Sequence, residues 1–354
     1  MNTQEKEVLQ SLRLSRVVIP VLIGIAVVIY LLYTQFDRRQ FEQIQWDGRA
    51  WAWIALAFIL LVLRHLSYSM RMRALTGERL TWKKAIEICT IWEFSGCVAP
   101  TSKGGPVVSM FVLPKEGVPL GQTVTAVLYT IILDSGFFVL LLPVLLWSYG
   151  PGMLFPGMTS FGDVSLASGA FFTIYGMMAA YWLALMLLVI IRPQLAPLAL
   201  GWLSRLPLLR RKKQAIERAG MEFALAATGL RRQSWKVHLQ AIGGTLGAWI
   251  LKFTMINCLL IAVAPQIPLD GTTQLLIYSR LVAMFIIMAF SPTPGGAGLA
   301  EAALPRFISD FVPLSVGLIV ALLWRAMAWY GYLLAGAIVV PQWIARNFSS
   351  KTKT

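Results

Sequence analysis

Long apolar stretches with few charged residues run through this chain and limit the folds open to it. Seven of them approach or exceed the roughly 20 residues that a helix needs to cross a bilayer. They lie at 17–34, 51–69, 121–148, 166–191, 238–264, 272–290 and 314–341. Hydrophobic residues make up 57% of the chain and charged residues 13%, unlike a soluble domain. The sequence therefore predicts an all-α, multi-pass membrane protein with one integral membrane domain over residues 1–354.

Lysine and arginine gather in some connections and avoid others. They are concentrated in 70–84, in 192–236 and in the C-terminal tail. Segments 149–165 and 265–271, by contrast, each hold a single charged residue, an aspartate. Because cytoplasmic loops of membrane proteins carry an excess of basic residues, we expect both termini in the cytoplasm of a bacterial inner membrane. This distribution accounts for the net charge of +15, so we expect no nucleic-acid partner.

Two further segments have local interpretations. The first apolar stretch is too long for a signal-peptide core and has no small-residue cleavage pattern, so we expect a retained helix. Within 192–236, apolar residues from Ile216 to Leu230 recur at helical spacing. They predict a helix that either lies on the inner leaflet or forms a solvated hairpin.

Arg64, His65, Arg71 and Arg73 cluster where the second span is expected to end, and we interpret them as orienting that span.

Two Pro/Gly segments interrupt the apolar sequence, one in each half. Residues 99–106 read Ala-Pro-Thr-Ser-Lys-Gly-Gly-Pro, and 291–298 read Ser-Pro-Thr-Pro-Gly-Gly-Ala-Gly. Irregular backbone persists at membrane depth only inside protein or beside a wet cavity, and matching breaks in two halves indicate a transporter's binding site. The expected topology returns the first broken hairpin, 84–114, to the cytoplasm and the second element, 291–310, to the outside. We therefore predict two facing re-entrant elements in an inverted-repeat-like arrangement.

Charged residues inside spans are costly and are functional candidates by default. Four cations outnumber three acids at or near mid-depth, which indicates an anionic ligand; the alternative is ion pairs that hold the bundle together. The N–H groups of half-helices that follow each Gly-Gly pair suit a phosphate, unless the breaks serve packing alone. The candidate substrate-binding residues are Pro100, Thr101, Lys103, Gly104, Gly105, Arg280, Pro292, Thr293, Pro294, Gly295, Gly296 and Arg325. Charge-coupling or structural roles fall to Glu93, Asp134, Lys252 and Glu301.

Catalytic and metal-binding motifs are missing from the sequence. It has two histidines, no nucleophile elbow, no phosphate-binding loop and no metal-ligand spacing around its three cysteines. We therefore expect a non-enzyme without cofactor or metal that moves an anionic lipid, a phospholipid or a polyprenyl phosphate, by scrambling or ion-driven transport.

Two alternatives to lipid movement stay open. One is a membrane enzyme acting on a lipid-linked sugar or headgroup, with Glu93, Asp134 or Glu301 as its acid. The other is an accessory subunit that presents lipid to a lipid-synthesising enzyme. The sequence indicates no oligomeric state.

The second break resembles a known family. Residues 291–304 carry Pro-Thr-Pro-Gly-Gly-x-Gly-x-x-Glu, which is similar to the motif of the lysylphosphatidylglycerol synthase/flippase membrane-domain family. Arg325 resembles that family's intramembrane arginine, and 94–134 resembles its first broken hairpin followed by a helix with an aspartate, here Asp134. The family's asparagine before the first proline and its Glu-Arg pair before the aspartate are absent here. The resemblance implies a flippase-like membrane domain, and we expect a stand-alone member without the aminoacyl-transferase domain.

Overall fold

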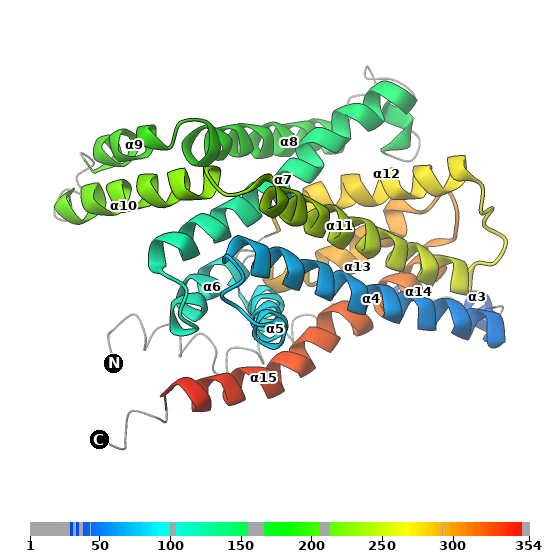
Figure 1. Ribbon diagram of the computed structural model, residues 1–354. Helices are drawn as coiled ribbons and strands as arrows, with labels where there is room; N and C mark the ends of the chain where they lie inside the picture. The colour runs from blue at the N-terminus through cyan, green and yellow to red at the C-terminus, as the bar shows by residue number, and fades with distance from the viewer. Residues whose placement is uncertain are drawn as a thin grey trace.

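The computed structural model contains helices and no strands in the residues that it describes, which are 29–30, 33–34, 38–42, 44–99, 104–154, 166–204, 213–291 and 293–348 (Figure 1). Six helical segments there are long and apolar enough to cross a membrane. These are Gly48–Leu75, Leu120–Ser148, Gly169–Ile191, Trp235–Val263, Gly271–Met288 and Leu314–Phe348. They correspond to six of the seven predicted spans and confirm the all-α membrane fold. The seventh, 17–34, lies almost wholly outside the described residues.

Thirteen α-helices lie in the described residues. They are α3 (Arg38–Glu42), α4 (Gly48–Leu75), α5 (Trp82–Val98), α6 (Gly104–Lys115), α7 (Leu120–Tyr149), α8 (Leu166–Leu185), α9 (Ala196–Leu203), α10 (Lys213–Arg231), α11 (Trp235–Val263), α12 (Gly271–Met288), α13 (Leu299–Phe307), α14 (Leu314–Arg325) and α15 (Gly331–Phe348). A π-helical stretch, Ala326–Tyr330, joins α14 to α15, and a 3-10 turn, Pro294–Gly296, precedes α13. A second π-helical stretch, Met186–Ile191, follows α8. Such stretches are rare and are frequently found at functional sites.

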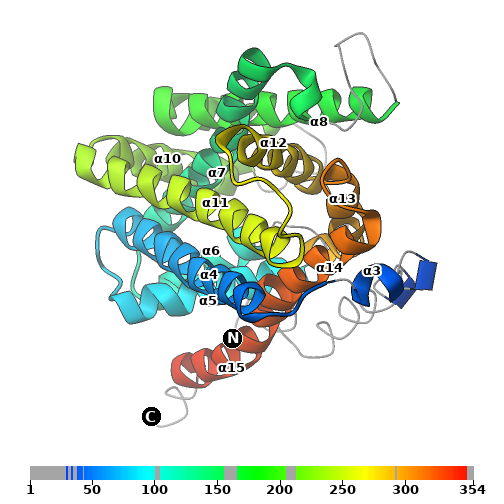
Figure 2. The ribbon, with the colours of Figure 1, turned by 90° about the vertical axis from the view of Figure 1, so that its right-hand side faces the viewer.

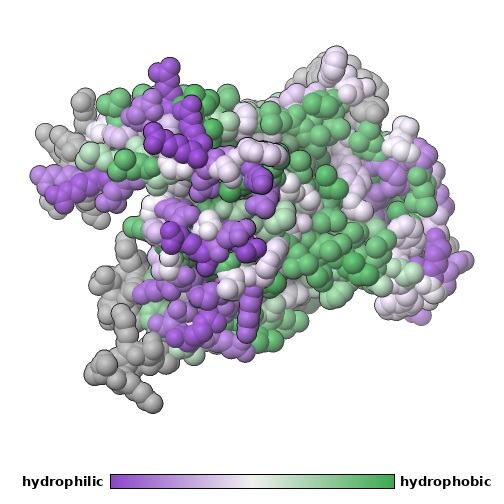
Figure 3. Space-filling view, in the orientation of Figure 1, coloured by the Kyte–Doolittle hydropathy of each residue, from purple (hydrophilic) through white to green (hydrophobic). Residues whose placement is uncertain are grey.

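The helix axes of α4, α8, α11 and α12 run in roughly the same direction across the molecule (Figure 1). A band of hydrophobic side chains covers much of the middle of this face, and hydrophilic side chains gather towards its two ends (Figure 3). Hydrocarbon cannot hydrogen-bond to backbone groups, so helices with apolar outer faces are the expected way to cross it.

Helices α4 and α11 lie side by side in both views (Figures 1 and 2). Small residues permit this approach, since a Cβ on Gly244 would lie 2.8 Å from the carbonyl oxygen of Ser67 and 3.0 Å from the Cβ of Arg71. Close packing at small residues is a main source of association between membrane helices, because lipid offers no hydrophobic driving force. The α4–α11 contact therefore depends on Gly244.

Gly244→Ala is expected to destabilise the protein by about 1–3 kcal/mol, because the added methyl group meets backbone that cannot rotate away. The neighbouring Gly243 has nothing within 4 Å of the corresponding Cβ position, so Gly243→Ala is the matched control. In a helix interior alanine is favoured over glycine, so the control should be neutral or slightly stabilising. Thermal unfolding in detergent measures both, and equal melting temperatures would contradict the packing argument.

The first break is a hairpin of two short helices. α5 and α6 pack against each other, and α6 ends near the end of the molecule where α4 ends and α7 begins (Figure 1). Their contact is close, since a Cβ on Gly105 would lie 2.6 Å from the ring of Trp92 and one on Gly104 would lie 2.2 Å from the carbonyl oxygen of Ser95. The second break comprises the turn Pro294–Gly296 and the nine-residue α13.

The end of α4 differs from the sequence-based expectation. The second span was expected to end at residue 69, with Arg71 and Arg73 in the following loop, but α4 continues to Leu75. Arg71 therefore lies within the helix, where it is buried. A mean-hydropathy criterion ends the span before the closely spaced Arg71 and Arg73, whereas here a carboxylate on α7 pairs with Arg71 and the helix continues.

A carboxylate outside the spans ties three elements together. Glu116, just after α6, accepts hydrogen bonds from Lys84 Nζ at 2.7 Å, Trp343 Nε1 at 2.8 Å and Arg346 Nη2 at 2.9 Å. Burial alone would raise the pKa of Glu116, but the hydrogen bonds from Lys84, Arg346 and Trp343 outweigh burial and hold that pKa below its ordinary value. Glu116 thus fastens α5, α6 and α15 at one end of the molecule.

Glu116→Gln is expected to lower stability at neutral pH by about 1–3 kcal/mol, since charge-assisted hydrogen bonds are lost. A carboxyl group whose pKa is lower in the folded state stabilises the fold above its unfolded pKa, and this contribution disappears as pH falls below about 4. The wild-type and variant melting temperatures should therefore converge in acid. Glu78→Gln is the control, because Glu78 is exposed and pairs with Arg73 at 3.3 Å. A difference that persists unchanged at pH 3.5 would contradict this role.

Candidate functional site

A cavity of about 570 Å³ lies between the helices. Its walls come from α4–α8, α11, α12, the turn Pro294–Gly296, α14, the stretch Ala326–Tyr330 and α15, and most of its lining side chains are apolar or aromatic. Five charged residues interrupt this lining: Arg64, Glu93, Asp134, Lys252 and Arg325. Each comes from a different helix, so the fold collects charges that are far apart in the sequence.

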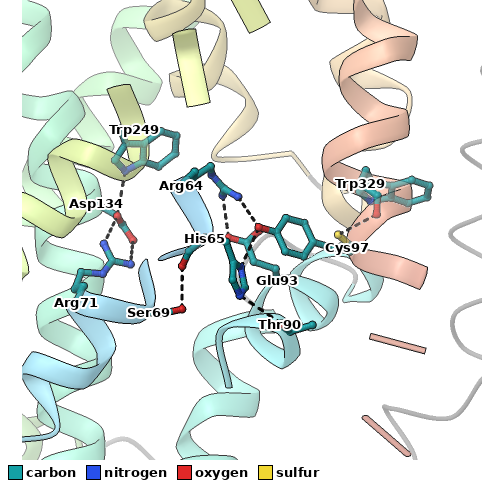
Figure 4. Close-up of polar contacts among 11 residues, drawn as sticks. Arg64, His65, Ser69, Arg71, Thr90, Glu93, Cys97, Asp134, Trp249 and Trp329 are labelled. Carbon is teal, nitrogen blue, oxygen red and sulfur yellow. Dashed lines mark hydrogen bonds and ion pairs between the residues drawn. The ribbon is translucent and has the colours of Figure 1, made fainter. Parts of the chain in front are cut away.

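Asp134 is held from two sides (Figure 4). Arg71 donates to both carboxylate oxygens, at 2.6 and 3.2 Å, and Trp249 Nε1 donates to Oδ1 at 3.0 Å. The same Arg71 also donates to the hydroxyl of Thr245 at 2.9 Å. A bidentate arginine is the strongest partner a carboxylate finds in proteins, so Asp134 is fixed in place and neutralised.

A second ion pair joins α4 to α5. Arg64 Nη2 donates to Oε1 of Glu93 at 2.8 Å, and its Nη1 donates to the hydroxyl of Tyr332 at 3.2 Å (Figure 4). The Tyr332 hydroxyl also lies 3.1 Å from Nδ1 of His65, whose Nε2 lies 3.2 Å from the carbonyl oxygen of Ile86. This chain of bonds is complete when Tyr332 donates to Nδ1 and the Nε2–H of His65 donates to Ile86.

The third pair sits at the second break. Arg325 Nε donates to Oε1 of Glu301 at 2.8 Å, and both side chains are almost fully buried, with 4% and 2% of their area exposed. Arg325 Nη1 donates to the carbonyl oxygen of Gly295 at 2.9 Å, while Glu301 Oε2 accepts from the backbone N–H of Gly298 at 2.9 Å. Glu301 therefore caps α13 itself, and Arg325 ties that cap to the turn.

Lys252 differs from the other cations of the cavity. Among the described residues, no carboxylate oxygen lies within 4.0 Å of its ammonium group, which instead faces the rings of Phe285 at 4.1 Å and Trp249 at 4.7 Å. Aromatic faces attract a cation but leave its charge uncompensated. Counting the described charges of this region, four cations meet three carboxylates, so one positive charge remains. They are Arg64, Arg71, Lys252 and Arg325 against Glu93, Asp134 and Glu301.

The two sequence breaks meet at this cavity. A Cβ on Gly295 would lie 3.2 Å from the Cα of Cys97, at the end of α5, and 2.3 Å from Nε1 of Trp329. Gly295 has φ +56° and Gly296 φ +70°, a region that favours glycine. Both glycines line the cavity, so this turn requires them for its backbone conformation and for the close approach.

The structure brings some of the predicted site residues together and separates others. Gly295, Gly296 and Arg325 line the cavity, as do Glu93, Asp134 and Lys252. Arg280 does not line it; its Nη2 donates to Asp310 at 2.5 Å. Thr293 does not line the cavity either; its hydroxyl lies 2.8 Å from that of Ser291, and Gly104 and Gly105 pack against α5. The backbone of Pro294 starts the turn, while Pro100, Thr101, Lys103 and Pro292 lie outside the described residues. Roles in binding for these residues stay predictions.

Sequence reasoning assigned Arg64 and Arg71 to orienting the second span, but both are buried. Arg64 lines the cavity and holds Glu93, and Arg71 holds Asp134 without lining the cavity itself. It also missed Trp249, which contacts Asp134 and Lys252 at once. The signal that could have found the arginines is the presence of Glu93 and Asp134, two acids in apolar helices that each need a cationic partner. Each carboxylate offered as a catalytic acid pairs with an arginine, and the described residues contain no group of three or more metal-ligating side chains.

Comparison with known proteins identifies the family. A sequence model described as the lysylphosphatidylglycerol synthase TM region matches residues 17–336. The chain belongs to this family. A UPF0104 membrane protein from Archaeoglobus fulgidus is 26% identical over 338 residues, which cover 91% of this chain and 95% of the relative. No solved structure matches. Membership in the lysylphosphatidylglycerol synthase TM family indicates a lipid-related function in the membrane, and the family motif falls on the turn and cap that Arg325 holds.

Proposed function

We propose that this protein moves an anionic lipid between the two leaflets, with the headgroup carried through the charged cavity. The observation that supports this most directly is Lys252, a cation without a carboxylate partner among the described residues, facing a cavity between membrane helices. A lone charge at this depth costs several kcal/mol unless something compensates it. A headgroup with one negative charge would supply that compensation each time it enters.

Hydrogen-bonding capacity at the cavity favours the same ligand. Several residues that line it have a buried donor atom without a partner in the structure. They are Arg64 (Nε), Trp324 (Nε1), Arg325 (Nη2) and Trp329 (Nε1). The buried unpartnered acceptor atoms of the described residues, on Thr130, Gln233 and Asn257, belong to residues outside this lining. Phosphate oxygens accept hydrogen bonds and carry negative charge, so small rearrangements of these donors would suit a phosphodiester.

The arrangement of the breaks supports access from both sides. We propose that α5 and α6 re-enter from the cytoplasmic side and that α13 re-enters from the other, so that the breaks meet near mid-depth. Basic residues gather at the end of the molecule that holds the α4–α5 and α10–α11 connections. Among them are Arg73, Arg79, Lys83, Lys84, Lys115, Arg231, Arg232, Lys236 and Arg346. By the positive-inside rule we assign this end to the cytoplasmic side.

Purified protein in liposomes tests the proposal. Vesicles carry a trace of fluorescent phosphatidylglycerol, phosphatidylcholine or polyprenyl phosphate, and dithionite destroys the label in the outer leaflet. Protein should render most of the anionic label accessible, and phosphatidylcholine should cross about tenfold more slowly. Equal crossing of phosphatidylglycerol and phosphatidylcholine would contradict a charge-selective cavity. No crossing of either anionic lipid by folded protein would contradict translocation.

A further inference from the structure

The cavity reaches the outer surface of the helix bundle between α6 and α8. Three of its lining residues are exposed: Val107 on α6, with 62% of its area accessible, Tyr181 on α8, with 43%, and Ala289 directly after α12. Val107 and Tyr181 are the two that lie on helices flanking α7. α6 packs on α5 and α7, and α8 packs on α7 and α12, so α7 forms the wall between them. The cavity therefore has a side opening over α7.

This opening faces the hydrocarbon layer. On α7 it is lined by Ile131 and Ser135, which lie near the middle of that 30-residue helix. At 1.5 Å per residue, Ser135 is about 22 Å from either helix end, so water at the membrane surfaces lies far away. Tyr181 likewise falls near the middle of the span Gly169–Ile191.

The rim of the opening is apolar, and polarity increases inwards. Val107 and Met110 line it from α6, and Met178 and Tyr181 line it from α8. Lys252, on α11, belongs to the same cavity. An amphiphile whose chains contact Val107 and Tyr181 can therefore place a negatively charged headgroup near Lys252 without leaving the bilayer.

We infer that the lipid enters and leaves sideways between α6 and α8, with its acyl chains against Val107, Met110, Met178 and Tyr181. The opening is thus occupied by the acyl chains of the lipid whose headgroup enters the cavity. The identity of that headgroup rests on the proposed function. The chains stay in hydrocarbon throughout, so only the headgroup needs the polar interior. Burial of apolar surface on the rim adds affinity without demanding one chain length.

Photo-crosslinking locates the chains independently of transport. The probe is phosphatidylglycerol with a diazirine in one acyl chain, irradiated with the full-length protein in liposomes and mapped by mass spectrometry. Adducts should concentrate on 106–111 of α6 and 177–182 of α8, and Lys252→Met should reduce them several-fold. Adducts spread evenly over the outer faces of α4, α11 and α15 would overturn the inference, as would adducts at the rim that Lys252→Met leaves unchanged. Rim adducts without lipid movement would contradict translocation but support the opening.

A reversible block provides a second readout. Val107→Cys is modified with a long-chain alkyl thiosulfonate, which forms a mixed disulfide that a reductant later removes. Ile338→Cys is the matched control, since Ile338 on α15 is also 62% exposed and does not line the cavity. Modification at 107 should slow crossing at least fivefold, and reduction should restore it, while modification at 338 should have no effect. Equal effects at both positions would overturn the inference, and so would a thiol at 107 that no reagent reaches because another segment covers it.

Discussion

Replacing Lys252 by methionine is expected to make the protein more stable and to stop lipid movement. A lysine at the centre of a membrane helix costs about 2.5–3.5 kcal/mol on insertion scales, and the rings of Trp249 and Phe285 recover part of this. Because Lys252 holds no carboxylate among the described residues, its removal leaves no acid there unpaired. Thermal unfolding should give a gain of about 1 kcal/mol or more.

The gain in stability separates a ligand-binding role from a structural one. Substituting a residue that holds the bundle together lowers both the stability and the activity of the protein. Substituting a binding residue that has no partner raises the stability and lowers the activity. Lys252→Arg keeps the charge and should keep part of the transport. A Lys252→Met variant that unfolds at a lower temperature than wild type would contradict the view that its charge is uncompensated.

Breaking the Glu301–Arg325 pair is expected to have the largest effect on folding. Both side chains are almost fully buried, so Glu301→Gln or Arg325→Met alone leaves an uncompensated charge and should cost about 3–5 kcal/mol. The double variant leaves no such charge and should recover much of that loss. Its transport should still fail, because the Gly295 carbonyl oxygen and the α13 cap both lose their ionic partner.

Denaturant titration of the two single variants and the double variant gives the coupling energy directly. The exposed pair Arg38–Glu42, whose side chains are 85% and 59% accessible, is the control and should show a coupling below about 0.5 kcal/mol. Additive losses at Glu301 and Arg325 would mean that the two residues act independently, contrary to the geometry of the turn.

Most of the membrane fold could be predicted from the sequence because hydrocarbon allows few alternatives. Apolar length identified six spans among the described helices, and Pro/Gly breaks identified both interruptions. The same limits explain the error at the end of α4. Arg71 is compatible with a buried helix only because Asp134 faces it from α7, and hydropathy along one segment carries no information about partners on another.

The candidate site could be predicted in part. The surplus of cations at depth pointed to an anion, but the sequence alone gave no way to tell which cation lacks a partner. Arg280 was grouped with the binding residues, and Asp310, which pairs with it, lies in the connection after α13. Lys252 was considered a coupling or structural charge, and its position between two aromatic rings emerges only when α11 and α12 are packed together.

The most direct test of the central claim compares lipid crossing in wild type, Lys252→Met and Lys252→Arg. Folded protein is reconstituted at equal density, and dithionite reports the accessible fraction of fluorescent phosphatidylglycerol over time. We predict fast crossing in wild type, at least about tenfold slower crossing in Lys252→Met, and an intermediate rate in Lys252→Arg. A Lys252→Met variant that moves phosphatidylglycerol as fast as wild type would show that the uncompensated charge in the cavity is not where the headgroup binds.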